Sequence, residues 1–129
     1  MVEVSAGTEG RVQRVVTDAD TARVAGSGDV DVLATPAVVA LCEAAAVAAV
    51  ADSLEPGTTT VGARISLDHL APTAVGRTVT ATARLERVQD RTLEFLVEAS
   101  DGAGTIATGL HVRVVVRRDA FLAAAQQRG

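Results

Sequence analysis

The chain has 129 residues, of which 48% are hydrophobic and 22% are charged, and its formal net charge is −4. This size and composition are typical of one globular domain around a single core. The acidic balance, with two phenylalanines as the only aromatic residues, argues against the basic and aromatic surface of a nucleic-acid-binding protein. We therefore expect a single domain over residues 1–129 and no nucleic-acid partner.

The lone cysteine and the apolar segments restrict the class further. Cys42 is the only cysteine, which excludes an intramolecular disulfide and a multi-cysteine metal site. No N-terminal segment combines a basic start with an apolar run, so no signal peptide is predicted. The most apolar segment, Pro36–Ala51, is short and alanine-rich and carries Glu43, which argues against a membrane span. We expect a cytoplasmic protein with no metal, no cofactor and no membrane partner.

The N-terminal quarter of the chain is predicted to hold little regular structure. We expect a mobile tail over residues 1–8 and a short strand over Gly10–Thr17. Asp18–Val32 is rich in Asp, Gly, Thr and Ser, which is typical of a loop, here with one helical turn.

A long helix follows this loop. Thr35 offers a hydroxyl that can cap a helix, and Pro36 fits the first helical position. The apolar segment then predicts a helix to about Ser53, which Glu55-Pro56-Gly57 ends.

The rest of the chain alternates apolar and polar residues, which predicts β-strands. Gln89-Asp90 and Asp101–Gly104 have the composition of hairpin turns, and tight turns imply antiparallel pairing. The economical packing is an α+β fold in which one antiparallel sheet wraps around one long central helix. The predicted strands are Thr59–Leu67, Arg77–Val88, Arg91–Ser100 and Thr105–Arg118, followed by a short helix over Ala120–Gln127 that Asp119 caps.

Alternation also predicts which side chains share a face of each strand. Three such faces are apolar, and the first of them ends in a histidine. The sets are Val61, Ala63, Ile65 and Leu67 with His69, then Val79, Ala81, Ala83 and Leu85, then Leu93, Phe95, Val97 and Ala99.

Three polar residues stand in apolar surroundings and are candidates for catalysis. Glu43 lies in the middle of the apolar helix, where a buried carboxylate needs a compensating partner. Thr35 lies at the start of this helix, and His69 ends the first long strand. A threonine, a glutamate and a histidine suffice for acyl transfer or hydrolysis. Structural alternatives stay open: Thr35 as a plain helix cap, and His69 as a core histidine bonded to Asp68 or to backbone.

Four further residues have a clear interpretation. Cys42 points about 100° away from Glu43 on a helix and is predicted to be a small buried thiol rather than a nucleophile. Gly62 in mid-strand predicts a close approach by a ligand or by the helix. His111 and Arg113 alternate with valines, so we expect them to face solvent or a partner, His111 in a structural role.

Three segments resemble the fluoroacetyl-CoA thioesterase-like branch of the hot-dog superfamily. They are ATPAVVALCEAAAVAAV, LEPGTTTVGARISLDHLAPTAVGRTVT and GLHVRVVV, which span residues 34–116. The resemblance implies a hot-dog fold and thioester hydrolysis on a small acyl-CoA. It implies catalytic roles for Thr35, Glu43 and His69, a glycine of the acyl pocket at Gly62, and a substrate-binding arginine at Arg113.

The resemblance leaves several points open. Val24–Ala34 has no aromatic residue where fluoroacetyl-CoA specialists carry aromatic lid residues, so the acyl group is not fixed. Thr35 and Glu43 lie about 12 Å apart on a straight helix. Either Thr35 belongs to a loop that folds back, or the site spans a subunit interface, as is usual in hot-dog homodimers. We expect a homodimer or higher assembly. The alternative functions are an acyl-thioester hydratase or dehydratase, and a non-catalytic acyl-CoA or small-ligand binding module.

Overall fold

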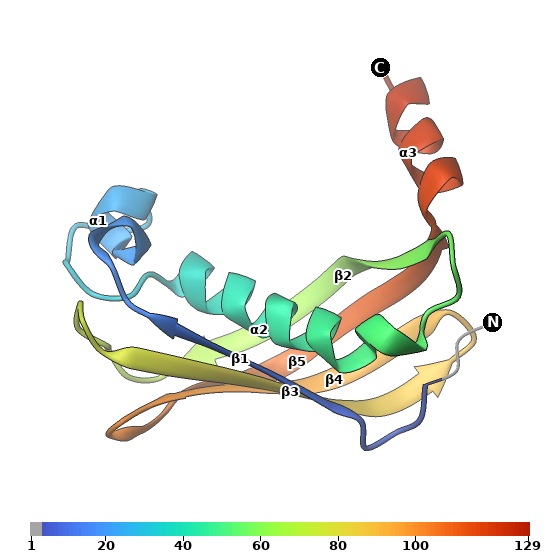
Figure 1. Ribbon diagram of the computed structural model, residues 1–129. Helices are drawn as coiled ribbons and strands as arrows, with labels where there is room; N and C mark the ends of the chain where they lie inside the picture. Colours follow the sequence, from blue (N-terminus) through green and yellow to red (C-terminus); the bar gives the residue numbers. More distant parts are fainter. Residues whose placement is uncertain (1–3) are drawn as a thin grey trace.

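The computed structural model, which describes residues 4–129, consists of one antiparallel sheet with a long helix, α2, lying across one face (Figure 1). The strand order is β1-β3-β4-β5-β2, so β1 and β2 form the two edges. This confirms the predicted α+β architecture. The elements are β1 (Glu9–Val15), α1 (Ala22–Ala25), α2 (Thr35–Val50), β2 (Thr58–His69), β3 (Thr78–Gln89), β4 (Thr92–Asp101), β5 (Gly104–Arg117) and α3 (Arg118–Gln127), with short 3-10 turns at Asp18–Asp20 and Ala51–Ser53.

The ordered chain begins earlier than predicted. Residues 1–3 of the predicted tail lie outside the described residues. The N–H of Gly7 donates to the carbonyl of Leu85, and the N–H of Leu85 donates to the carbonyl of Thr8. The segment just before β1 is therefore fixed to β3.

Helix α2 begins one residue before its predicted start. Ala34 is the N-cap and Thr35 is the first helical residue, with Pro36 beside it in the first turn. The predicted role of Thr35 as the helix cap is therefore wrong, and its hydroxyl is available for another partner. By length and composition alone, Thr35–Ser53 is apolar enough to cross a membrane, and here it packs on the sheet as the core helix.

Small residues let α2 lie close to the sheet. The helix packs chiefly against β1 and β3 and buries the side chains of Cys42, Ala45, Ala46 and Ala49. A Cβ atom at Gly10 of β1 would overlap the backbone of the helix at Ala45 and Ala49. The alanine-rich composition of the helix is therefore a packing requirement, and the larger side chains come from the sheet.

The predicted faces of β3 and β4 are confirmed. The four predicted apolar side chains of β3 and the four of β4 are all buried in one cluster with α2. Strands β3, β4 and β5 pair in sequence order, each antiparallel to the next. Phe95 on β4 is the largest fully buried side chain.

Strand β2 departs from strict alternation. Its pairing with β5 shifts between Gly62, opposite Arg113, and Arg64, opposite Val112, so that Ala63 is an extra residue in a β-bulge. Residues paired across an antiparallel ladder share a face. Ile65 pairs with His111, and so the prediction that Val61 and Ala63 share a face with Ile65, Leu67 and His69 is wrong.

Helix α3 follows β5 directly and projects away from the sheet (Figure 1). Its N-cap is Arg117, and Asp119 lies in the first turn, which corrects the predicted cap. None of its residues is buried in this chain.

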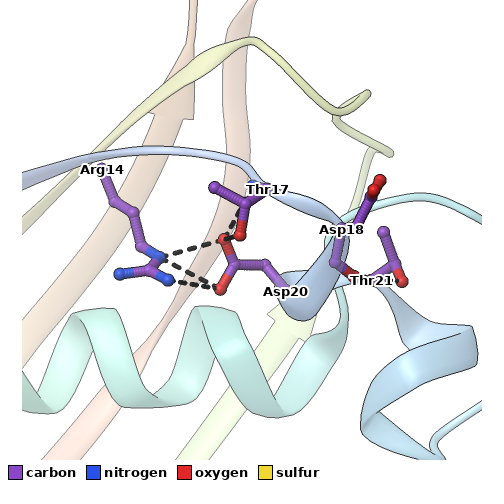
Figure 2. Close-up of polar contacts among 5 residues, drawn as sticks. All are labelled: Arg14, Thr17, Asp18, Asp20 and Thr21. Carbon is purple, nitrogen blue, oxygen red and sulfur yellow. Dashed lines mark hydrogen bonds and ion pairs between the residues drawn. The ribbon is translucent and has the colours of Figure 1, made fainter.

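An ion pair supports the loop that leads into α2 (Figure 2). Two nitrogens of the Arg14 guanidinium donate to the carboxylate of Asp20, at 2.8 to 3.0 Å, and the N–H and hydroxyl of Thr17 donate to the same carboxylate. These contacts lower the pKa of Asp20, chiefly through Arg14. The Asp20 carbonyl in turn accepts from the N–H of Ala34, the N-cap of α2. The ion pair thus fixes the backbone immediately before Thr35.

Candidate active site

Thr35 and His69 meet at the N-terminal end of α2. The Oγ1 atom of Thr35 lies 2.8 Å from Nδ1 of His69, the last residue of β2. A hydroxyl that donates to an imidazole nitrogen is the arrangement of a nucleophile with its general base.

The second nitrogen of His69 argues against an ordinary core histidine. Its Nε2 atom is buried and has no hydrogen-bond partner among the described residues. His69 is therefore bonded through its ring to neither Asp68 nor a backbone carbonyl, which were the structural alternatives. A buried polar atom without a partner costs about 1–3 kcal/mol, and a catalytic role is one reason why a protein retains such an atom.

Glu43 has its partners on β5 rather than at Thr35 or His69. Its Oε2 atom accepts a hydrogen bond from Nη1 of Arg113 at 3.2 Å and lies 3.8 Å from Nε2 of His111. The Glu43 side chain is 40% exposed, whereas the Arg113 side chain is 8% exposed. The expected compensating partner of the carboxylate is thus Arg113.

Arg113 and His111 point into the protein, which corrects the prediction that they face solvent or a partner. Both are buried, whereas the alternating Val112 and Val114 point to the other face of the strand and are only partly buried. The Nε and Nη2 atoms of Arg113 donate to the hydroxyl and the carbonyl of Thr60 at 2.9 and 3.1 Å. Its Nη1 atom serves Glu43 and His111. Most of the guanidinium donors are therefore used within the chain. The bonds to Thr60 and His111 hold the guanidinium in place, and Nη1 also donates to the Glu43 carboxylate.

Gly62 makes the close approach that its mid-strand position predicts. A Cβ atom there would lie 2.5 Å from Oε2 of Glu43 and 3.4 Å from Nη1 of Arg113. Any side chain at this position would displace the carboxylate.

Two members of this group were not anticipated as functional residues. His111 is 1% exposed, and burial, with a smaller contribution from the charge of Arg113, lowers its pKa despite the bond to the Arg64 carbonyl. Thr60 anchors Arg113. Thr60 lies two residues before Gly62, which puts both on the same face, and this spacing is the signal that could have identified it.

The predicted site residues thus form two groups in one chain. Thr35 and His69 form the first, and Glu43, Gly62 and Arg113 form the second, with no hydrogen bond between the groups among the described residues. Thr35 and Glu43 are separated along α2, as the spacing requires. Cys42 is fully buried, and burial raises the pKa of its thiol to about 11, in agreement with the predicted buried thiol.

An open groove of about 380 Å³ lies beside the first group. Thr35 and His69 line it together with the loop before α2 and the residues after β2. The groove is lined mainly by small and aliphatic side chains. They include Ser27, Gly28, Val30, Leu33, Ala34, Leu70, Ala71 and Pro72.

Known proteins share this sequence and fold. Residues 16–119 match the sequence profile of the family described as fluoroacetyl-CoA-specific thioesterase. The fluoroacetyl-CoA thioesterase of Streptantibioticus cattleyicolor is 42% identical over 98 residues, which cover 76% of this chain and 70% of that protein.

Solved structures agree. A structure of a fluoroacetyl-CoA thioesterase superposes with a TM-score of 0.91 at 35% identity, covering 98% of both chains. A thioesterase superfamily member from Thermus thermophilus has a TM-score of 0.91 at 28% identity, covering 98% of this chain and 94% of that one. The chain is therefore a hot-dog protein that belongs to the fluoroacetyl-CoA-specific thioesterase family.

Proposed function

We propose that the protein hydrolyses a small acyl-CoA thioester, with Thr35 as the nucleophile and His69 as the general base. As a member of its family the protein is a thioester hydrolase. The observation that carries the assignment of roles is the 2.8 Å contact between the Thr35 hydroxyl and the His69 ring.

The proposed reaction has two steps. Thr35 Oγ1 attacks the thioester carbon while its proton passes to His69 Nδ1, and collapse of the tetrahedral intermediate breaks the carbon–sulfur bond. The imidazolium returns the proton to the leaving CoA sulfur. Water then attacks the acyl-threonine, assisted by the neutral imidazole, and releases the acid and the free hydroxyl.

The start of α2 supports stabilisation of the oxyanion. Thr35 is the first helical residue, so its N–H has no acceptor within the helix, and Pro36 has no N–H. The Thr35 N–H is thus a donor at the positive end of the helix dipole, where negative charge is stabilised.

Family membership supports a small acyl group. The groove beside Thr35 has no aromatic lining residue, and the segment before Thr35 contains none. Fluoroacetyl-CoA, for which the Streptantibioticus cattleyicolor relative is named, is one candidate, and acetyl-CoA and propionyl-CoA are others of similar size.

The test is release of the CoA thiol from a panel of short-chain acyl-CoAs, with direct detection of bound acyl-CoA in parallel. We expect thiol release that is lost in Thr35→Ala. Bound acyl-CoA without thiol release would instead favour a binding module, and water added to an enoyl-CoA without loss of the thioester would favour a hydratase.

We further propose a homodimer whose active site combines Thr35 and His69 of one chain with the partner subunit's Glu43. Three observations support it. The two groups are separated within one chain, β2 is a sheet edge with exposed Gly62 and Arg64, and one apolar side of α2 is exposed. The exposed residues on that side of α2 are Pro36, Ala40, Ala44, Val47 and Ala48.

Complementation tests this arrangement. Thr35→Ala and Glu43→Gln chains carrying different affinity tags are co-expressed, and the doubly tagged dimer is purified. If each site draws on both chains, one site of the mixed dimer is intact, so about half of wild-type turnover returns. Sites contained within single chains would leave the mixed dimer as inactive as its parents. A strictly monomeric mass by light scattering at micromolar concentration would rule out the dimer itself.

A further inference from the structure

His111 is an almost fully buried side chain beside Glu43, and the mechanism above leaves it without a role. It lies on β5, opposite Ile65 of β2, with 1% of its surface exposed. Its Nδ1 atom is 2.8 Å from the carbonyl oxygen of Arg64, and its Nε2 atom is 3.1 Å from Nη1 of Arg113.

The chemistry of these two partners fixes the proton on the ring. A carbonyl oxygen only accepts, so Nδ1 must carry a hydrogen. A guanidinium only donates, so Nε2 must be free to accept. Both conditions hold in the neutral Nδ1–H tautomer, and protonation of Nε2 would leave two donors facing each other.

Each bond of His111 supports a different part of the Glu43 group. The bond to Arg64 holds the strand at the bulge next to Gly62, the position that must stay free of a side chain. The Nη1 atom of Arg113 carries two hydrogens. It donates one to His111 and the other to Glu43, so the bond to His111 helps to orient the bond to Glu43.

We propose that His111 is a positioning residue that acts through Arg113: as a neutral hydrogen-bond acceptor it aims the guanidinium at Glu43 and so fixes the carboxylate beside Gly62. This inference rests on the proposed function, since its kinetic test measures the effect of Glu43 placement as thioester hydrolysis.

The surroundings of the ring favour the neutral form. Among residues 4–129, Glu43 of α2 is the one carboxylate paired with the ring, 3.8 Å from Nε2, and Arg113 on the same strand opposes a second positive charge. From β2 the ring meets the Arg64 carbonyl, and from β4 it meets the apolar ring of Phe95, with centroids 6.4 Å apart. Burial and Arg113 lower the pKa of His111, while Arg64 and Glu43 oppose this effect.

The first arm of the test does not depend on activity. Nitrogen NMR of the ring is simple because the chain has two histidines, His69 and His111, and a His69→Gln variant assigns the signals. We expect His111 to be the neutral Nδ1–H tautomer at pH 7, with a protected Arg113 Nε–H signal. A Nε2–H tautomer or a protonated ring at pH 7 would overturn the proposal.

The second arm compares two amide replacements. His111→Asn can keep the donor to Arg64 but loses the acceptor for Arg113, whereas His111→Gln can place an amide oxygen near the original Nε2. We expect kcat to fall about tenfold or more in His111→Asn with KM within about threefold, and partial rescue in His111→Gln. Leu110→Asn, an exposed change on the opposite face of β5, is the matched control and should leave kcat unchanged.

Each outcome has a distinct consequence. Folded His111→Asn with wild-type kcat would overturn the positioning role, as would equal loss in both replacements with an unchanged Arg113 signal. If the replacements fail to fold, the ring tautomer of the wild-type protein still decides whether His111 can accept from Arg113. If the wild-type protein releases no thiol, the proposed function is refuted. The NMR measurement still shows whether His111 accepts a hydrogen bond from Arg113.

Discussion

The Thr35 hydroxyl lies 2.8 Å from His69 Nδ1, although the two residues are 34 positions apart in the chain. The first comes from the start of the central helix and the second from the end of an edge strand. Because Ala34 is the helix cap, this hydroxyl is not needed to begin the helix. We therefore expect a substitution at position 35 to change turnover without changing the stability of the helix.

Substitution of Thr35 tests this expectation. Thr35→Ala should lower turnover about 10²-fold or more, because it removes the proposed nucleophile, and Thr35→Ser should retain substantial activity. Melting temperatures should change little in both, since the hydroxyl caps no helix. A loss of stability near the 1 kcal/mol of a missing cap, with turnover intact, would return Thr35 to a purely structural role.

Substitution of His69 and Glu43 tests whether they act as one unit. His69→Ala and Glu43→Gln should each lower turnover about 10²-fold or more. If both serve one site, the double variant should lose little beyond the worse single variant, because such effects are non-additive. Steady-state kinetics on the three proteins measures this. Full activity of His69→Ala would defeat the mechanism.

Gly62→Ala should disturb the Glu43 carboxylate. The added Cβ would lie 2.5 Å from Oε2 of Glu43, so the carboxylate must move. Because this oxygen is the end of a flexible, partly exposed side chain, we expect lower turnover with little change in stability. Gly102→Ala is the matched control, because a Cβ there meets no atom within 4 Å. Kinetics and denaturant unfolding of both variants check this, and wild-type turnover in Gly62→Ala would show that the contact is unimportant.

The Arg14–Asp20 pair should make stability depend on pH in the acid range. The pKa of Asp20 is lower in the folded protein than the ordinary aspartate value of 3.8, chiefly because of Arg14, so its contribution to stability is complete above that value and disappears as pH falls through the folded pKa. Asp20→Asn should lower the melting temperature at pH 7 and flatten the acid limb of the stability curve. Asp31→Asn, which breaks the exposed pair with Arg23, should do neither.

Cys42 should be unreactive in the native state. Its thiol is fully buried and its pKa is raised to about 11, so almost no thiolate is present at pH 8. Ellman's reagent should label the protein only after unfolding, which also keeps the thiol-release assay free of background. Rapid labelling of the folded protein would contradict this assignment.

Local signals in the sequence were sufficient for most of the fold. Turn residues between β3, β4 and β5 fixed the hairpins, and the apolar faces of β3 and β4 followed from strict alternation. The bulge at Ala63 could not be predicted, because one extra residue in a strand leaves no pattern of its own.

The candidate site was predicted only in part. Thr35, Glu43 and His69 stand out because each is polar in apolar surroundings, but their partners depend on contacts far apart in sequence. Arg113 and His111 were assigned to the outer face because polar residues between valines usually face solvent. Here they are buried because they satisfy one another, Glu43 and backbone carbonyls, a network that no single strand reveals.

The bulge at Ala63 also explains how Gly62 and His69 come to lie on the same face of β2. Gly62 and His69 are seven positions apart, and in an unbroken strand an odd spacing puts two residues on opposite faces. One extra residue between them lets both face the helix, so a single strand leaves space for the Glu43 carboxylate and gives the Thr35 hydroxyl its histidine partner. Deleting Ala63 would turn the side chains of one half of β2 to the opposite face. Either Gly62 or His69 would then point away from α2. Strand β2 therefore consists of two segments, one on each side of Ala63, whose side chains alternate in opposite phase.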